Sequence, residues 1–156
     1  MIVSYLHKKL YGVCTSSKAS FAIDFARKAY DQGYLDIYGN WILNVAEAFN
    51  ACRGAVYFRI ERMNSFHDLH NHLMQKIPVA VSVRRLQGGA TPYANGHYMV
   101  VVGWDRVKQA VLCIDPAFKR SLLRRYPLRA FLCAWMRSNN LAYVPMVQGP
   151  LSLTSC

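Results

Sequence analysis

Apolar residues in the first half of the chain recur at intervals of three and four, which places them on one face of an α-helix. Ile2, Val3, Tyr5 and Leu6 follow this spacing and predict an amphipathic helix over about residues 1–10. A loop over residues 12–17 follows it. The chain therefore opens with helical structure.

Three more helices are predicted before or between the strands. Ser17 or Ser20 is a candidate N-cap for a helix that continues to about Tyr30. Ser65 has the same role for a helix over about 65–76, which Pro78 ends. The third covers 41–50, where four apolar residues lie at helical spacing: Trp41, Val45, Ala48 and Phe49.

The second half of the chain is patterned mainly as strands. Residues 56–60 alternate between apolar and polar positions, whereas 79–83 form a short apolar run typical of a buried strand. Further strands are predicted over 97–105, 111–115, 121–126 (a strand or a turn) and 141–146, with a short helix over 127–135 and a loose tail from residue 147. Helices followed mostly by strands indicate an α+β domain with an antiparallel sheet, covering residues 1–146.

One hairpin in this pattern carries candidate chemistry. His97 begins an apolar strand, and the returning strand ends with Asp115 directly before Pro116. In an antiparallel pair with this spacing the two side chains lie side by side at one end of the hairpin. A carboxylate in that position holds an imidazole in one tautomer and makes it a competent base.

Length and composition fit a globular domain. The chain has 156 residues, of which 53% are hydrophobic, enough for a core. No apolar run reaches the roughly 18 residues that span a bilayer, and the first residues are not patterned as a signal peptide. The chain as it stands is most simply cytoplasmic, although a missing N-terminus could carry an export signal.

The five cysteines are odd in number and irregularly spaced, with no C-x-x-C pair, which argues against a disulfide framework and a structural zinc site. Cys52, Cys113 and Cys133 lie among apolar residues and are expected to be buried. The histidines of the His67–His72 segment do not share one helix face, so no metal site is expected there.

The formal net charge of +11 raises the hypothesis of nucleic-acid binding. No RNP-type, zinc-finger or recognition-helix pattern accompanies the charge, so a solvated basic face or a groove for an acidic partner is favoured. The excess lies mainly in the second half, at Arg84-Arg85, Lys119-Arg120, Arg124-Arg125, Arg129 and Arg137.

With these elements in place, the chain resembles papain-fold cysteine peptidases of the bacteriocin-processing type (peptidase family C39), in the branch of stand-alone bacterial domains. The resemblance covers about residues 1–145 and depends on the order and spacing of several motifs. These are Tyr30-Asp31 with Tyr34, Gly39-Asn40-Trp41-x-x-Asn44-x-Ala46, Arg59-Ile60, Phe66-His67-Asp68-Leu69, the strand from Ile77 to Val83, Gly89-Ala90, the run from Asn95 to Gly103, Asp115-Pro116-Ala117, and Tyr126-Pro127 with Phe131 and Trp135.

The resemblance implies a papain-like fold and peptide-bond hydrolysis, with His97 as the catalytic base and Asp115 as the residue that orients it. The family's nucleophile is a cysteine at the start of the first helix, preceded by an oxyanion-stabilising glutamine. Both would lie upstream of Met1, so the sequence is interpreted as N-terminally truncated. A peptide or protein substrate is implied, acidic if the basic surface contacts it, and no cofactor or metal.

Several alternatives stay open at this point. Cys14 precedes a helix, as a nucleophile should, but it lies too close to Tyr30-Asp31 to leave room for the family's two helices. Cys113 shares a strand face with Asp115 but has no helix behind it to lower its pKa. The chain could also be an inactive relative that binds peptides or proteins, or a basic nucleic-acid-binding domain. Trp41 and Trp135 are most simply interpreted as core residues.

Overall fold

The computed structural model describes residues 2–3, 6, 18–38 and 40–148 of the chain. The chain forms two compact units, which we name unit 1 (Met1–Phe58 with Met146–Cys156) and unit 2 (Arg59–Pro145). The prediction of one domain over 1–146 stays a prediction. No helix within the described ranges has the length and apolar character needed to span a membrane.

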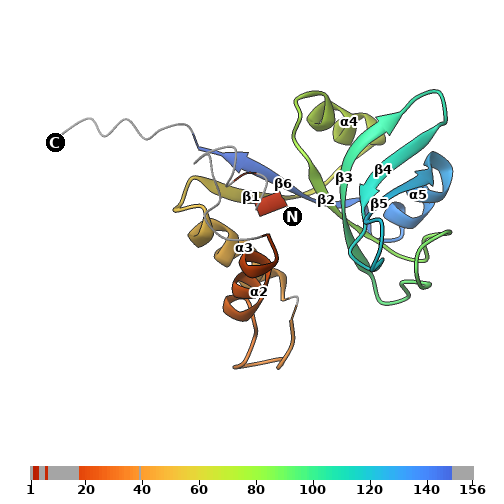
Figure 1. The fold of residues 1–156 in the computed structure, drawn as a ribbon. Coiled ribbons are helices and arrows are strands. Elements are labelled where there is room, and N and C mark those ends of the chain that lie inside the picture. The colour runs from red at the N-terminus through yellow and green to blue at the C-terminus, as the bar shows by residue number, and fades with distance from the viewer. Residues whose placement is uncertain (1, 4–5, 7–17, 39, 149–156) are drawn as a thin grey trace. The chain divides into compact units, whose positions relative to one another are not determined.

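The α+β prediction is confirmed. The sheet has the strand order β1-β6-β2-β3-β4-β5, and β2 through β5 pair antiparallel with their neighbours, as does β2 with β6 (Figure 1). The elements are α2 (Lys18–Lys28), α3 (Trp41–Ala51), β1 (Val56–Arg62), α4 (Phe66–Met74), β2 (Val79–Val83), β3 (His97–Asp105), β4 (Ala110–Ile114), β5 (Leu123–Pro127), α5 (Leu128–Met136) and β6 (Leu141–Val147).

In unit 1, helices α2 and α3 are joined by a loop that Asp31 organises. The Asp31 carboxylate accepts hydrogen bonds from Tyr34 N at 3.0 Å and from Asn40 Nδ2 at 2.7 Å. The bond from Asn40, with those of the nearby backbone amides, lowers the pKa of Asp31. Asn40 Oδ1 in turn accepts from Ile42 N and caps α3. The Tyr30-Asp31 and Asn40-Trp41 motifs therefore fix the entry to α3.

Helices α2 and α3 of unit 1 lie close to their predicted bounds, whereas one side chain of α3 differs from its prediction. Helix α2 ends at Lys28, two residues before the predicted end, and α3 matches its prediction to within one residue. Phe49 was expected on the core face of α3, but its side chain is 43% exposed and its ring lies against Gly54. Ile2, Val3 and Leu6 are helical, and the rest of residues 1–17, including Cys14, lies outside the described residues.

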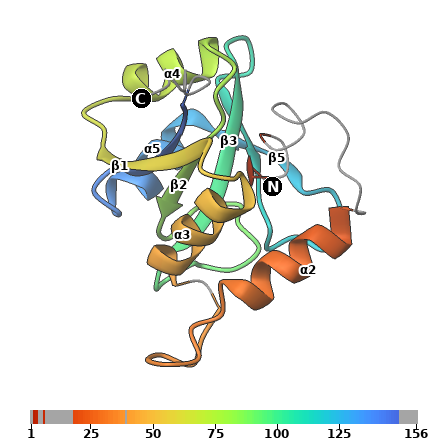
Figure 2. The same ribbon diagram turned by 90° about the vertical axis from the view of Figure 1, so that its left-hand side faces the viewer.

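In unit 2, helix α4 begins as predicted and ends early. Ser65 and Asp68 form a reciprocal capping box at its first turn. The helix ends at Met74 because Lys76 adopts a left-handed conformation with φ 59°, so the helix has already stopped before Pro78. Phe66 contacts both Trp104 near the hairpin turn and Phe131 of α5. Figures 1 and 2 show α4 beside the turn that joins β3 to β4.

The core of unit 2 is built around β2 and α5. All five residues of β2 are buried, as its apolar run predicts. Phe131 and Trp135 of α5 are also buried, and Trp135 Nε1 donates to Leu141 O at 3.0 Å. Because α4 and α5 meet through Phe66 and Phe131, both helices cover the same face of the sheet.

The last strand extends beyond the predicted boundary. β6 continues to Val147, and Gln148 N donates to Ala55 O at 3.0 Å. The first residues of the predicted loose tail are therefore part of the strand and its hydrogen bonding. Residues 149–156 lie outside the described residues.

Candidate active site

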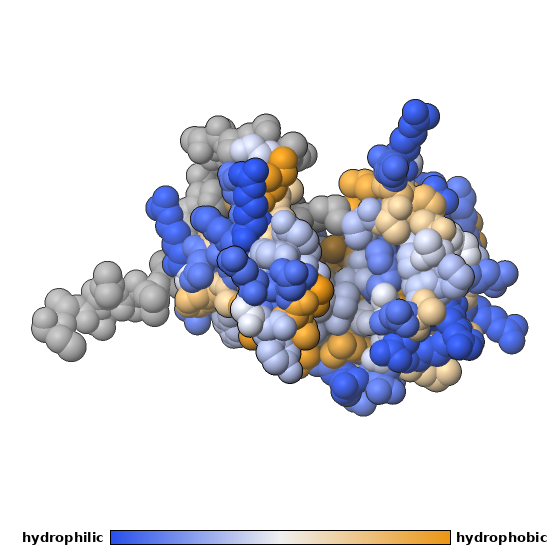
Figure 3. Space-filling view, turned by 90° about the horizontal axis from the view of Figure 1, so that it is seen from below, coloured by the Kyte–Doolittle hydropathy of each residue, from blue (hydrophilic) through white to orange (hydrophobic). Residues whose placement is uncertain are grey.

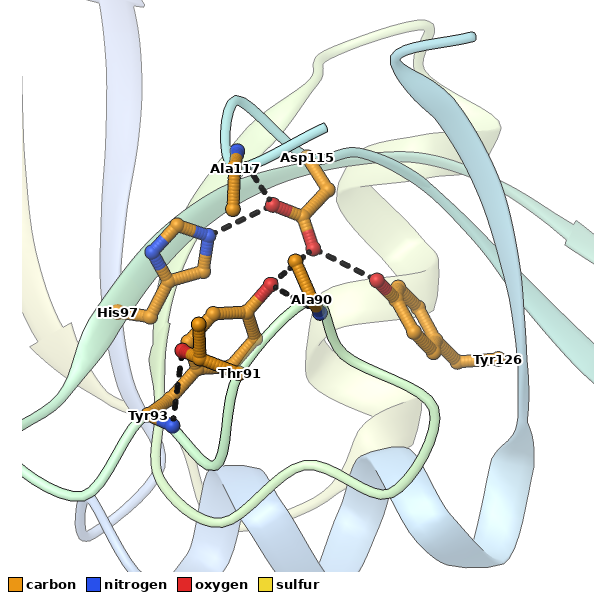
Figure 4. Close-up of polar contacts among 7 residues, drawn as sticks. All are labelled: Ala90, Thr91, Tyr93, His97, Asp115, Ala117 and Tyr126. Atoms are coloured by element: carbon orange, nitrogen blue, oxygen red, sulfur yellow. Dashed lines mark hydrogen bonds and ion pairs between the residues drawn. The ribbon is translucent and has the colours of Figure 1, made fainter. Parts of the chain in front are cut away.

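The hairpin of unit 2 brings His97 and Asp115 together, which confirms the predicted geometry. His97 is the first residue of β3 and lies opposite Val83 of β2. Asp115 directly follows β4, whose last residue, Ile114, lies opposite Val100. His97 Nε2 is 2.7 Å from Asp115 Oδ1 (Figure 4). Gly96, with φ +100°, turns the chain into β3 in a conformation that favours glycine.

Asp115 is fully buried and accepts four hydrogen bonds. Besides His97, its donors are Ala117 N at 3.0 Å, Tyr93 Oη at 3.0 Å and Tyr126 Oη at 2.6 Å. Each carboxylate oxygen accepts two of the four bonds (Figure 4). The side chain therefore has one orientation in which all its partners are satisfied.

These contacts keep the Asp115 carboxylate ionised. Burial raises the pKa of Asp115, but the hydrogen bonds from Tyr126, Ala117, His97 and Tyr93 outweigh burial and bring the pKa below its ordinary value. Burial and the neighbouring carboxylate raise the pKa of Tyr126, and burial raises that of Tyr93. Both tyrosines therefore stay protonated and donate.

The ionised Asp115 carboxylate determines which ring nitrogen of His97 carries the hydrogen. An acceptor-only partner requires that Nε2 carries the hydrogen, so Nδ1 is the nitrogen left to accept or donate a proton. The His97 side chain is 17% exposed, so its ring is partly open to solvent. This arrangement suits a general base whose tautomer is fixed by a buried acid.

Tyr93 holds the His97 ring from one side. The two rings stack with 4.0 Å between centroids and 17° between planes. The Tyr93 hydroxyl also accepts a hydrogen bond from Ala90 N at 3.0 Å, which ties the ring to its own loop. Gly89 makes room for it, because a Cβ at that position would lie 2.4 Å from Tyr93 Cε2.

The two tyrosines were not predicted as site residues. Tyr126 is the one buried residue of β5 and directly follows Arg124-Arg125, and an aromatic residue beside two arginines was a usable signal. Tyr93 follows Thr91-Pro92 in a loop and has φ 49°, a conformation with no periodic signature in the sequence. Its role comes from contacts with residues elsewhere in the chain.

The described cysteines differ in their surroundings. Cys52 and Cys113 are buried as predicted, and burial raises the pKa of both thiols. The expectation for Cys133 was wrong, because this thiol is exposed. It lies in a shallow depression of about 540 Å³ lined also by Lys108 and Leu132. In the described part of the chain, His97 has hydrogen-bond and ring contacts with Asp115 and Tyr93 and with no thiol.

His67, His70 and His72 all lie on α4. Within the described ranges, no group of three or more histidine, cysteine, aspartate or glutamate side chains could hold a metal ion. His72 Nδ1 is buried without a hydrogen-bond partner. Trp135 is a core residue, as predicted, with 1% of its side chain exposed.

Comparison with known proteins identifies the fold and the family. No curated protein sequence matches the chain. Its structure is similar to a crystal structure from Bacillus anthracis that is described as a proposed C39-like peptidase, with a TM-score of 0.57 and 17% identity. The similarity covers 95% of this chain and 88% of the other and shows that the two share a fold. The profile of the Peptidase C39-like family matches residues 1–143. The chain therefore belongs to the Peptidase C39-like family.

Proposed function

We propose that this protein hydrolyses peptide bonds by a cysteine-histidine-aspartate mechanism in which His97 is the catalytic base and Asp115 positions it. The observation that carries the proposal is the 2.7 Å hydrogen bond between His97 Nε2 and the fully buried, four-fold hydrogen-bonded Asp115. Membership of a peptidase-like family supports a peptide or protein as the substrate.

The proton transfers follow from the tautomer. His97 Nδ1 takes the proton of a cysteine thiol, and the thiolate attacks the carbonyl carbon of the scissile bond. His97 then gives that proton to the leaving amine nitrogen, so the C–N bond breaks and a thioester remains. Water attacks the thioester while His97 accepts its proton, which returns to the thiolate as the carboxylic acid product leaves. Asp115 stays ionised and stabilises the imidazolium at each step.

The family resemblance assigns the nucleophile to a cysteine before Met1. Among the described cysteines, Cys52 and Cys113 are poor candidates for the nucleophile because they are buried and their thiol pKa values are raised. The exposed Cys133 lies on α5, and the contacts of His97 are with Asp115 and Tyr93. The proposal therefore concerns His97 and Asp115 as partners of a cysteine supplied by the preceding helix.

The test uses the protein together with the residues that its reading frame encodes ahead of Met1. Fluorescein-labelled casein is the substrate, and iodoacetamide is the thiol reagent. We expect iodoacetamide-sensitive hydrolysis that falls about a hundredfold or more in His97→Ala, the loss typical of removing a general base. Asp115→Asn should lower the rate and change its pH profile. His67→Ala, an exposed histidine of α4, is the matched control.

Hydrolysis that survives in His97→Ala would contradict the proposal, and so would activity that iodoacetamide does not affect. A second candidate function is a peptide-binding domain without turnover. It is favoured by the absence of a thiol among the partners of His97 in the described residues. Saturable binding of labelled peptides with no hydrolysis by the extended protein would support this candidate instead.

A further inference from the structure

We propose that Arg84, Arg85 and Arg137 form a pocket for a carboxylate of the bound polypeptide, beside His97. We name it the arginine pocket. Its lining in unit 2 is these three arginines and Ala94, and its volume is about 330 Å³. The inference deepens the proposed function, because it assigns an acidic group to the peptide that His97 acts on.

The fold fixes the arginine pocket at the His97 end of the sheet. Val83, the last residue of β2, lies opposite His97, and Arg84 and Arg85 follow directly. Arg84 N donates to Ala134 O at 2.9 Å, which anchors this segment to α5. Arg137 closes the pocket from the C-cap of α5, where its Nη1 is 3.4 Å from Arg85 O. Most of the guanidinium donors remain available for a ligand.

The arginine pocket lies close to the candidate catalytic base. A Cβ added to Gly96 would lie 3.8 Å from Arg84 Nε, so this guanidinium reaches the residue directly before His97. An extended peptide advances about 3.3–3.6 Å per residue, so an acidic residue in the pocket would lie within roughly three residues of the scissile bond. The pocket is therefore placed to select the substrate sequence near the cleavage point.

The charge of the arginine pocket is not balanced within unit 2. Unit 2 contains thirteen arginine and lysine residues and four carboxylates. Every one of the four carboxylates has another partner: Glu61 pairs with Arg59, Asp68 caps α4, Asp105 accepts from Lys108 N, and Asp115 binds His97. In the described part of the chain, no ion pair involves Arg84, Arg85 or Arg137.

A carboxylate fits this charge and shape. Guanidinium groups bind carboxylates in a two-pronged geometry, and three of them around one pocket leave an excess of donors that an anion satisfies. In the view from below, Figure 3 shows many strongly hydrophilic side chains on its right-hand side, among paler and some hydrophobic ones. The lining contains no aromatic ring on which a nucleotide base could stack, which disfavours a single-stranded nucleic acid as the ligand.

The experiment measures binding, so it does not require turnover. The probes are short fluorescein-labelled peptides of alanine, serine and leucine with one glutamate at each position in turn, and a matched set with glutamine. Each peptide is made with an amidated and with a free C-terminus, which separates a side-chain carboxylate from a terminal one. Fluorescence polarisation gives the Kd for each peptide on the full chain.

Two triple variants with equal changes in net charge are compared. The first is Arg84→Gln, Arg85→Gln and Arg137→Gln, which removes the arginine pocket. The second is Arg106→Gln, Arg125→Gln and Arg129→Gln, which changes three exposed arginines of unit 2 outside that pocket. Circular dichroism reports whether each variant folds, and the single variants Arg84→Gln and Arg137→Gln replace the first triple variant if it does not.

We expect the unmodified protein to bind peptides with a carboxylate at one or two positions about tenfold more tightly than their neutral counterparts, the contribution of one charge-assisted interaction. The control variant should keep this preference and the first variant should lose it. A preference equal in both variants, or equal at every glutamate position, would overturn the inference. The inference would also be overturned if the first variant changed the binding of a labelled oligonucleotide and left the binding of every peptide unchanged.

The outcomes also separate this inference from the proposed function. A pocket-dependent preference for acidic peptides, with no hydrolysis by the protein extended ahead of Met1, would support the arginine pocket and contradict the peptidase mechanism. Hydrolysis that depends on His97, with no preference for carboxylates, would contradict the arginine pocket alone.

Discussion

Tyr93 contacts both members of the candidate dyad. Its ring lies parallel to that of His97 at 4.0 Å between centroids, and its hydroxyl donates to Asp115 Oδ2 at 3.0 Å. The same side chain thus limits the tilt of the imidazole and holds the carboxylate that orients it. This double contact ties the position of Tyr93 to that of both His97 and Asp115.

Replacing either tyrosine hydroxyl should weaken the fold and loosen Asp115. Tyr93→Phe and Tyr126→Phe each remove a donor to a buried carboxylate, so we expect each to lower the free energy of unfolding by about 1–3 kcal/mol. Because both hydroxyls bind Oδ2, the double variant should deviate from the sum of the singles by about 0.5 kcal/mol or more. Urea unfolding followed by circular dichroism measures all three. Additive losses would show that the two bonds act independently.

Gly89→Ala should disturb the site although residue 89 touches neither His97 nor Asp115 in the hydrogen-bond network. The new methyl group would lie 2.4 Å from Tyr93 Cε2, and the buried, stacked ring has little room to move. We expect a loss of about 1–3 kcal/mol in unfolding free energy, typical of overpacking. Gly33→Ala is the matched control, since no atom lies within 4 Å of its added Cβ. Equal effects of the two substitutions would contradict the prediction.

Asp115 should contribute an acid-sensitive part of the stability. Its pKa in the folded protein lies below its ordinary value of 3.8, so its contribution is fully present well above pH 3.8 and is lost as the pH falls toward the folded pKa. The Asp115→Asn variant should lack this pH-dependent contribution to stability. At neutral pH its free energy of unfolding should be lower by about 3 kcal/mol, because the buried donors lose their charged acceptor.

The measurement is the free energy of urea unfolding from pH 7 down to pH 3 for the unmodified protein and Asp115→Asn. The difference in unfolding free energy between the two proteins should narrow as the pH falls. Other carboxylates, such as Asp31, titrate in both proteins, so their contribution cancels in this difference. A difference that stays constant over the whole range would show that the stabilisation does not depend on ionised Asp115.

The three described cysteines, Cys52, Cys113 and Cys133, should react in the order of their exposure. Cys133 is exposed, whereas Cys52 and Cys113 are fully buried and their thiol pKa values are raised. Iodoacetamide acts on the thiolate, so a short treatment of the folded protein should modify Cys133 well before the other two. Peptide mass mapping after quenching gives the modified fraction at each site, with urea-unfolded protein as the control. Early modification of Cys113 would mean that β4 opens readily.

Local sequence signals determined most of the elements. Ser65 marked the start of α4, and the apolar run of 79–83 marked the buried strand. Both signals depend on residues within a few positions of each other, so no knowledge of the fold is needed. The proximity of His97 and Asp115 was also predictable, since a short hairpin brings the start of one strand near the end of the other, although neither residue is the direct strand partner of the other.

Ends of elements and surface exposure were less well determined. The left-handed Lys76 stops α4 before Pro78, and nothing in the local pattern requires that conformation. Cys133 lies in an apolar stretch of α5, yet it faces out of the unit because the sheet buries Phe131, Ala134 and Trp135 instead. Which side of a helix is covered depends on its neighbours.

Thus the sequence by itself determined the α+β class, the hairpin and the two residues at its end. Only the tertiary structure decided what surrounds them: Tyr93 and Tyr126 reach Asp115 from 22 and 11 residues away, and Arg137 meets the Arg84-Arg85 segment across 52 residues. Such contacts form only when the chain returns to the same place in space, because side chains far apart in sequence share no local period. The physical reason is that short-range patterns set the conformation of a segment, whereas packing of the whole sheet and its helices sets the partners of each buried group.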